Sequence, residues 1–198
     1  MLVFREMAVR SEVVEGLQSS PKNAGSVIGS KRLPPSKTLD DLMRCILVCH
    51  DVLRINGKLS GSSQDELVMM EMIEKEYDCE FISRDSDSVR VRIRDVTETF
   101  TILKVFEFSS DRKMMSVTVK REDGQVVNYA KGADMMIKKK LENVYAEEES
   151  LINKLNSYAS TGLRTLMYAQ RLLAGTEAED QVECKYSLLG ITGVEDLL

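Results

Sequence analysis

The chain has 198 residues, 43% hydrophobic and 30% charged, which is enough to bury one core of ordinary domain size. Its net charge of −5 argues against a nucleic-acid-binding surface, which is usually basic, but not against a small anionic ligand held by a local cluster of cations. No apolar run approaches the roughly 18 residues of a membrane span. Arg5, Glu6 and Arg10 interrupt the first apolar residues, so a secretory signal is not expected either.

The first 36 residues are expected to form a strand and a long loop. Residues 2–14 are apolar enough for a short strand, whereas residues 15–36 are rich in Ser, Gly, Pro and Lys. That composition predicts a mobile polar surface loop without a core of its own. A polar segment of this length is typical of an insertion or a linker. The folded domain is therefore expected over residues 37–198.

Two helices are predicted after this loop. Ser36 or Thr38 can cap the first, and Ser62 or Ser63 can cap the second, which carries two carboxylates in its first turn and ends near residue 77. The positions expected to face the core are Leu39, Leu42, Met43, Ile46, Leu47 and Leu53 from the first helix, and Leu67, Met70 and Ile73 from the second.

The hydrophobic period then changes from helical to two. Strands are predicted over residues 79–82, 89–94, 100–108, 114–120 and 126–130, with an Asp-Gly hairpin signal at 123–124. Helices over 133–141 and 147–159 and strands over 165–169 and 186–191 follow. Because the central strands have no long crossovers between them, the sheet should be mainly antiparallel. The predicted fold class is α+β, a mainly antiparallel sheet flanked by helices.

The cysteines and the single histidine do not form a recognisable metal site. Cys45 and Cys49 share one face of an apolar helical pattern, and no cysteine pair has zinc-finger spacing. The four cysteines are therefore interpreted as reduced core thiols. His50 has no nucleophile nearby in the sequence and is interpreted as structural. The run Glu147–Glu149 is interpreted as a solvated helix start.

A few residues could bind a nucleotide, although each also has an ordinary structural interpretation. Phe108 lies on the same side of the predicted strand as Phe106 and could stack on a base, or both could be core phenylalanines. Lys131 precedes Gly132, which would let a ligand approach the backbone closely, so the lysine could reach a base or a phosphate. Most lysines, however, are simply solvated.

The same ambiguity holds for three charged residues. Arg164 could bind a phosphate through two hydrogen bonds, or it could complement the C-terminus of the preceding helix. Glu66 could accept a hydrogen bond from an adenine amino group, or it could complement the dipole at the start of its own helix. Asp65 is ambiguous in the same way.

Taken together, five segments resemble motifs of the nucleotide-binding (N) domain of P-type ATPases, in the right order over about residues 40–198. They are residues 61–68 (GSSQDELV, similar to S-P-D-E-x-x-L-V), 107–117 (EFSSDRKMMSV, similar to E-F-x-S-x-R-K-R-M-S-V), 131–134 (KGAD), 162–166 (GLRTL) and 188–197 (LLGITGVEDL, similar to L-L-G-A-T-A-I-E-D-K-L). The Asp of KGAD together with GLRTL resembles the phospholipid-transporting, or flippase, branch. Residues 1–6 are similar to the stretch that follows the family's D-K-T-G-T-L-T motif.

The resemblance implies a set of ATP-binding residues. Phe108 would stack on adenine, Glu66 would accept from the base, Ser110 would hydrogen-bond nearby, Lys113, Lys131 and Gly132 would line the pocket, and Arg164 with Thr165 would hold the phosphate side. Three positions depart from the family pattern: Gln64 replaces a proline, Met114 an arginine and Leu197 a lysine. The first two departures could lower affinity.

The resemblance also implies what the chain does not carry. It has no D-K-T-G and no G-D-G-x-N-D, so no catalytic or metal-binding residue is expected in it, and Mg²⁺ would be held mainly by an absent phosphorylation domain. The expected function is presentation of MgATP to an aspartate in that domain, driving lipid translocation by a full-length ATPase on the cytosolic face of a membrane. The expected partners are the phosphorylation and actuator domains of the same polypeptide, and the isolated domain is expected to be monomeric and inactive.

Two alternatives stay open at this point. The chain could be a degenerate nucleotide-binding-like domain that serves as a regulatory or protein-interaction module, which the substitutions Gln64 and Met114 and the long polar loop would favour. It could also be the N domain of a P-type cation pump, since the residues that choose the cargo would lie in membrane segments.

Overall fold

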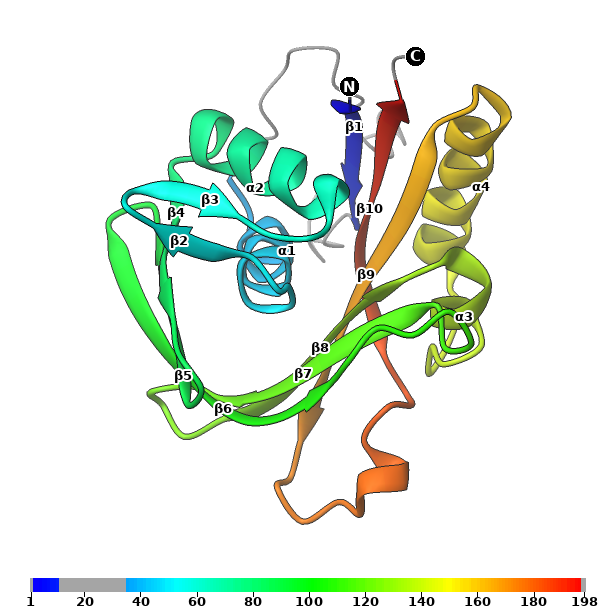
Figure 1. Ribbon diagram of the computed structural model, residues 1–198. Helices are drawn as coiled ribbons and strands as arrows, with labels where there is room; N and C mark the ends of the chain where they lie inside the picture. Colours follow the sequence, from blue (N-terminus) through cyan, green and yellow to red (C-terminus); the bar gives the residue numbers. More distant parts are fainter. Residues whose placement is uncertain (1, 11–34, 197–198) are drawn as a thin grey trace.

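The computed structural model describes residues 2–10 and 35–196, and its main element is one curled sheet of eight strands (Figure 1). The strand order is β1-β10-β9-β8-β7-β6-β5-β4, and every neighbouring pair is antiparallel. The predicted α+β class with a mainly antiparallel sheet is therefore confirmed.

The elements of the sheet are joined mostly by short turns. Its strands are β1 Leu2–Val9, β4 Cys79–Arg84, β5 Ser88–Ile93, β6 Val96–Phe106, β7 Met114–Lys120, β8 Val126–Gly132, β9 Arg164–Leu173 and β10 Ser187–Asp196. A separate hairpin is made of β2 Leu53–Ile55 and β3 Lys58–Ser60. The helices are α1 Lys37–Val48, α2 Gln64–Glu76, α3 Asp134–Lys138 and α4 Ala146–Ser160, with a 3₁₀ turn at Glu179–Gln181.

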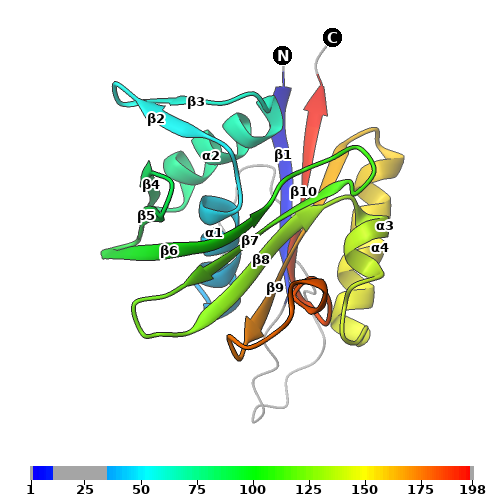
Figure 2. The ribbon, with the colours of Figure 1, turned by 60° about the horizontal axis from the view of Figure 1, so that its bottom comes forward.

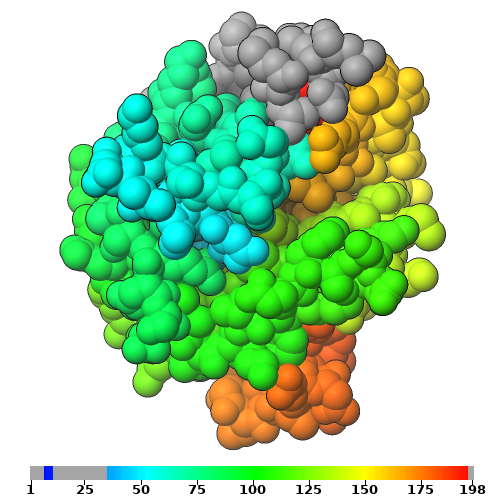
Figure 3. Space-filling view, viewed as in Figure 1, coloured from blue at the N-terminus to red at the C-terminus, as the bar shows by residue number. Residues whose placement is uncertain are grey.

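The helices cover the sheet from two sides. Helices α1 and α2 lie inside the curl, whereas α3 and α4 pack on the other side of β8, β9 and β10 (Figure 2). The connection between β9 and β10, orange in Figure 3, projects below the rest of the molecule. Each side of the sheet has its own buried apolar cluster, called here the α1/α2 core and the α3/α4 core.

Strand alternation decides which side chains enter which core. On β9, Tyr168 is in the α1/α2 core, and its neighbours Met167 and Ala169 are in the α3/α4 core. On β8, Tyr129 faces the α1/α2 core, and two residues further along Lys131 takes the same face. The sheet therefore directs the Lys131 side chain towards α2.

Both long N-terminal helices begin at a predicted cap. The Ser36 hydroxyl accepts from the Leu39 amide at 3.1 Å, and the Ser63 hydroxyl accepts from the Glu66 amide at 3.4 Å. The residues predicted to form the core face of α1 are buried, except for Leu53. The prediction for Leu53 was wrong, because this residue lies in β2 and is 46% exposed. The β2–β3 hairpin was missed, although its Asn-Gly turn at 56–57, with positive φ at both residues, is a strong hairpin signal.

Several predicted boundaries differ from the structure. The strand predicted over 100–108 starts at Val96 and ends at Phe106, so Phe108 lies outside it. The helix predicted over 133–141 spans only Asp134–Lys138. The strand predicted over 2–14 is found over Leu2–Val9, and the predicted polar loop at 15–36 lies almost wholly outside the described residues.

Two interpretations of single residues were also wrong. Glu148 is not solvated: it is 2% exposed, accepts from the Tyr145 amide at 3.1 Å and pairs with Arg10 at 3.1 Å. Cys184 is only half-buried, although Cys45, Cys49 and Cys79 are buried free thiols as predicted. Burial raises the pKa of Cys49 to about 12, which keeps this thiol protonated and unreactive at neutral pH.

His50 makes stability depend on pH. Its Nε2 lies 2.8 Å from the Leu47 carbonyl oxygen and its Nδ1 accepts from the Val52 amide at 2.9 Å, so the ring is neutral with the proton on Nε2. Burial lowers its pKa to about 3, helped by the nearby charges of Lys131 and Arg84. The unfolded state therefore binds a proton below about pH 6.5 that the folded state refuses until about pH 3, and stability falls as pH decreases through this window.

We expect urea unfolding at pH 5 to give a free energy of unfolding lower than at pH 7 by about 2 kcal/mol from this histidine alone. In His50→Gln the neutral amide cannot titrate, so this part of the pH dependence should disappear. An equal loss of stability in the variant and the wild type would show that other groups cause it.

Candidate functional site

The centre of the candidate site is an ion pair between α2 and the end of β8. Lys131 Nζ contacts Glu66 Oε1, and the two side chains are only 11% and 13% exposed. Glu66 Oε2 also accepts from the Asp51 amide at 3.1 Å. Two residues that the sequence marked separately, 65 positions apart, are thus in direct contact. No pattern in the sequence predicted this pairing.

A small cavity, called here the Lys131 pocket, surrounds this ion pair. It encloses about 10 Å³, which is room for one water molecule and too little for a purine. A bound base would therefore lie across the mouth of the pocket. The side chains around the pair are Ile46, His50, Asp65, Met69, Met70, Leu166 and Tyr168.

A second ion pair borders the Lys131 pocket. Arg164, the first residue of β9, lies 2.7 Å from Asp65 Oδ2, so its guanidinium reaches the start of α2. The other oxygen of Asp65, Oδ1, is buried and has no hydrogen-bond partner among the described residues. Asp65, which the sequence left ambiguous, is thus a carboxylate of the site. Thr165, half-buried, follows Arg164 and pairs with Gly193 of β10.

The residues between β6 and β7, 107–113, form the Phe108 loop, which lies beside the end of β8. Phe108 is 60% exposed, so it is not a core phenylalanine. Ser110 and Lys113 are also exposed. Lys113 has a left-handed backbone with φ of 50°, and its carbonyl oxygen accepts from the Ala133 amide at 2.9 Å. The loop thus brings an exposed ring and an exposed ammonium group to the end of the strand that carries Lys131.

Gly132 has a packing role in the structure. A Cβ atom at this position would lie 2.6 Å from the Lys113 carbonyl oxygen and 2.6 Å from Met114 Cβ. The space that the glycine leaves free is therefore taken by β7, and the absence of a side chain lets the two strands approach.

The departures from the family pattern have visible structural settings. Gln64 is the first residue of α2, a position where proline is especially favourable. Met114 is 1% exposed and packs in the α3/α4 core, so the methionine contributes to packing rather than to a charged surface. Leu197 lies outside the described residues.

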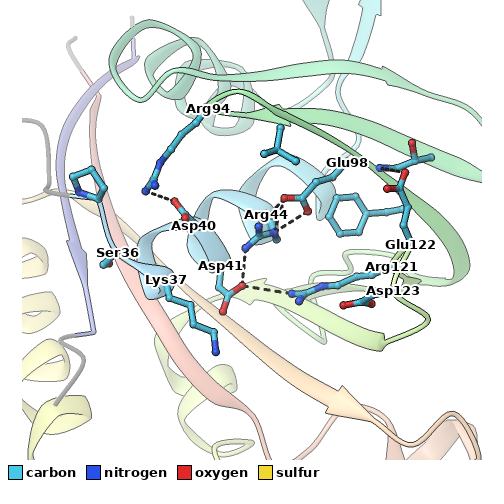
Figure 4. Close-up of a pocket in the computed structure, with 14 residues that line it drawn as sticks. Ser36, Lys37, Asp40, Asp41, Arg44, Arg94, Glu98, Arg121, Glu122 and Asp123 are labelled. Atoms are coloured by element: carbon cyan, nitrogen blue, oxygen red, sulfur yellow. Dashed lines mark hydrogen bonds and ion pairs between the residues drawn. The ribbon is translucent and has the colours of Figure 1, made fainter. Parts of the chain in front are cut away.

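A much larger hollow, about 600 Å³, lies at the start of α1, away from these residues (Figure 4). Its arginines already point at carboxylates: Arg44 lies 2.7 Å from Glu98 and 3.0 Å from Asp41, and Arg94 lies 2.6 Å from Asp40. Because these cations are neutralised within the fold, the hollow has little positive charge to offer a polyphosphate. None of the predicted ATP-binding residues lines it.

Two further properties of the described residues bear on their chemistry. Within residues 2–10 and 35–196, no group of three or more His, Cys, Asp or Glu side chains is placed to hold a metal ion. In the same part of the chain, no helix is both long and apolar enough to cross a membrane.

Comparison with known proteins shows which family the chain resembles. The family model described as P-type ATPase, cytoplasmic domain N, matches residues 38–198. Phospholipid-transporting ATPase 10 of Arabidopsis thaliana is 30% identical over 251 aligned residues, covering 99% of this chain and 21% of the relative. Phospholipid-transporting ATPase tat-1 of Caenorhabditis elegans is 33% identical, covering 82% of this chain and 15% of the relative. Phospholipid-transporting ATPase IC of Mus musculus is 26% identical, covering 76% of this chain and 14% of the relative.

The fold and the clustered residues thus define an α+β domain with a cationic and acidic site at one end of its sheet. The chain belongs to the cytoplasmic N-domain family of P-type ATPases, because the family model covers most of its length. It spans about a fifth or less of the length of these curated relatives.

Proposed function

We propose that this chain is the ATP-binding domain of a phospholipid-transporting P-type ATPase. In this proposal it binds MgATP weakly and presents the γ-phosphate to an aspartate of a separate phosphorylation domain, so it supplies positioning rather than bond-breaking. The observation that carries the proposal is the meeting of Glu66, Lys131 and Arg164 at the end of the sheet that also carries the Phe108 loop.

Each side chain has a definite role in this proposal. Adenine stacks on Phe108 across the mouth of the Lys131 pocket, because the pocket itself is too small for a purine. The amino group of the base donates to the unpaired Asp65 Oδ1 or to Glu66. Lys131 and the exposed residues Lys113 and Ser110 flank the base and the ribose. Arg164, which is 55% exposed, and Thr165 bind the phosphates so that they extend away from the domain.

Magnesium enters this proposal with the nucleotide. The residues around the Lys131 pocket offer one carboxylate pair, Glu66 and Asp65, and each already contacts a cation of the protein. A Mg²⁺ ion prefers phosphate oxygens, water and a few carboxylates. The triphosphate and the phosphorylation domain would therefore hold it, and this chain would bind the base and the ribose.

The function of the whole protein is inferred from the three relatives described above, which are named phospholipid-transporting ATPases. The full-length protein would be an ATP hydrolase that moves a phospholipid, with this domain on the cytosolic face of the membrane. Its partners would be the phosphorylation and actuator domains of the same polypeptide. The names of the relatives favour lipid over a cation as the cargo.

The direct test is a calorimetric or NMR titration of the chain with ATP, with and without Mg²⁺. We expect saturable binding with a Kd of about 0.1–1 mM. Lys131→Ala should weaken it at least tenfold, because a buried ammonium group beside the base is lost. The matched control is Lys120→Ala, an exposed lysine at the opposite end of β7. Absence of binding in the folded wild type would favour the alternative of a degenerate regulatory or interaction module.

Phe108→Ala separates stacking from stability. The ring is 60% exposed, so its removal should leave the free energy of unfolding almost unchanged. Loss of stacking should raise the Kd for ATP about fivefold. Thermal unfolding and the same titration measure the two effects, and an unchanged Kd would contradict the stacking role.

A further inference from the structure

A chain of buried hydrogen bonds lies on the side of β7 and β8 that faces away from the α1/α2 core. The Tyr186 hydroxyl donates to Asn128 Oδ1 at 2.5 Å, and Asn128 Nδ2 donates to the Ser116 hydroxyl at 3.3 Å. Ser116 then donates to Glu183 Oε1 at 2.6 Å. Ser116 and Asn128 are both fully buried. The carboxylate of Glu183 is therefore held in place by the sheet.

Glu183 belongs to the connection between β9 and β10, yet it reaches the Phe108 loop. Its Oε1 accepts from Arg112 Nη2 at 2.5 Å, and the two side chains are 15% and 32% exposed. The main-chain oxygen of Glu183 accepts from Lys140 Nζ at 2.8 Å, which fixes the connection itself. An ion pair this shielded, with one partner already hydrogen-bonded to the sheet, is better ordered than an exposed surface pair.

Arg112 uses the rest of its guanidinium to organise the Phe108 loop. Its Nη1 donates to the Glu107 carbonyl oxygen at 2.8 Å, and the group lies 5.8 Å from the centroid of the Phe106 ring. The Arg112 amide donates to the Ser109 hydroxyl at 3.2 Å. Arg112 thus holds the main chain at residue 107 through its guanidinium and the Ser109 side chain through its main-chain amide.

The Phe108 side chain itself has little packing to orient it, since most of its surface is exposed. Its direction depends on the backbone of the Phe108 loop, where the Arg112 guanidinium holds the Glu107 carbonyl and the main-chain amides of Arg112 and Lys113 donate to Ser109. We propose that Glu183 is a positioning residue of the nucleotide site: through Arg112 it holds the Phe108 loop in the conformation that presents the ring to the base. This inference rests on the proposed function, and it links the β9–β10 connection to nucleotide affinity.

The test compares Glu183→Ala with wild type by ATP titration of the full chain. We expect the Kd to rise about fivefold, because the ring samples orientations that cannot stack. In the double variant Glu183→Ala/Phe108→Ala the Kd should be no higher than in Phe108→Ala alone, since both changes remove the same contact. The matched control is Glu179→Ala, a carboxylate of the same connection that is 67% exposed and should leave the Kd unchanged.

A second measurement reports on the free protein. Amide hydrogen exchange of Arg112 and Lys113, which donate to the Ser109 hydroxyl and carbonyl at 3.2 and 2.7 Å, should be faster in Glu183→Ala. If Glu183→Ala unfolds, Glu183→Gln keeps one acceptor oxygen for Ser116 and Arg112, loses the charge, and should show a smaller rise in Kd in the same direction.

The outcomes separate the two proposals. No ATP binding by folded wild type overturns the proposed function and this inference with it. If the wild type binds ATP and Phe108→Ala weakens that binding, but neither Glu183→Ala nor Glu183→Gln changes the Kd, the positioning role of Glu183 is overturned and the proposed function stands. Additive losses in the double variant also overturn it, because they would mean that Glu183 acts by a route other than the Phe108 ring.

Discussion

Gly132→Ala should lower the free energy of unfolding by about 3 kcal/mol, because the added methyl group has no room between β7 and β8. Its Cβ would lie within 2.6 Å of a main-chain oxygen and of a Cβ atom on β7, neither of which can move without shifting the strand. The shift would begin at Lys113 and Met114, where the Phe108 loop enters β7. We therefore expect weaker ATP binding together with lower stability.

Urea unfolding measures the loss of stability in Gly132→Ala, and Gly61→Ala is the matched control. The atoms nearest to a Cβ at position 61 belong to Val52, with its Cγ2 at 3.2 Å and its Cα at 3.5 Å, so the cost there should stay below about 1 kcal/mol. Wild-type stability in Gly132→Ala would mean that the two strands do not approach as closely as the structure places them.

Glu66→Ala should destabilise the chain by about 3 kcal/mol at pH 7, because it leaves the Lys131 ammonium group buried without its partner. The lysine side chain is only 11% exposed, and its other neighbours in the Lys131 pocket include Ile46, Met70 and Leu166. Those apolar groups cannot replace the lost carboxylate. Chemical unfolding of the variant beside wild type measures the loss.

Two further variants show whether the unpaired charge is the cause. The double variant Glu66→Met/Lys131→Met removes both charges and should recover most of the lost stability. Asp65→Ala removes the carboxylate that pairs with Arg164. Because Arg164 is 55% exposed and can be solvated, the loss of stability in this variant should stay below about 1 kcal/mol. Equal losses in Glu66→Ala and Asp65→Ala would contradict the special cost of the buried lysine.

Local signals predicted the parts of the fold that depend on neighbouring residues. Ser36 and Ser63 marked the helix starts because a capping hydroxyl acts within three residues. The Asp-Gly turn and strict alternation of apolar residues marked the central strands for the same reason. The family motifs indicated Lys131, Phe108 and Arg164 as candidate nucleotide-binding residues.

Contacts between distant segments could not be predicted in this way. The pairing of Glu66 with Lys131 depends on which face of β8 turns towards α2, and that face is set by the register with β7 and β9. The contact of Glu183 with Arg112 depends on the path of the β9–β10 connection beneath the loop, across 71 positions. Neither spacing has a characteristic sequence pattern.

The sequence by itself thus determined the class of fold and the helix starts, because both rest on interactions among residues close in the chain, and its family motifs supplied the candidate residues of the proposed nucleotide site. Only the tertiary structure decided that Lys131 is buried against a carboxylate, that Gly132 serves strand packing and that Arg112 of the Phe108 loop pairs with Glu183. Those properties arise from sheet register and curl, which bring together side chains that no local rule connects.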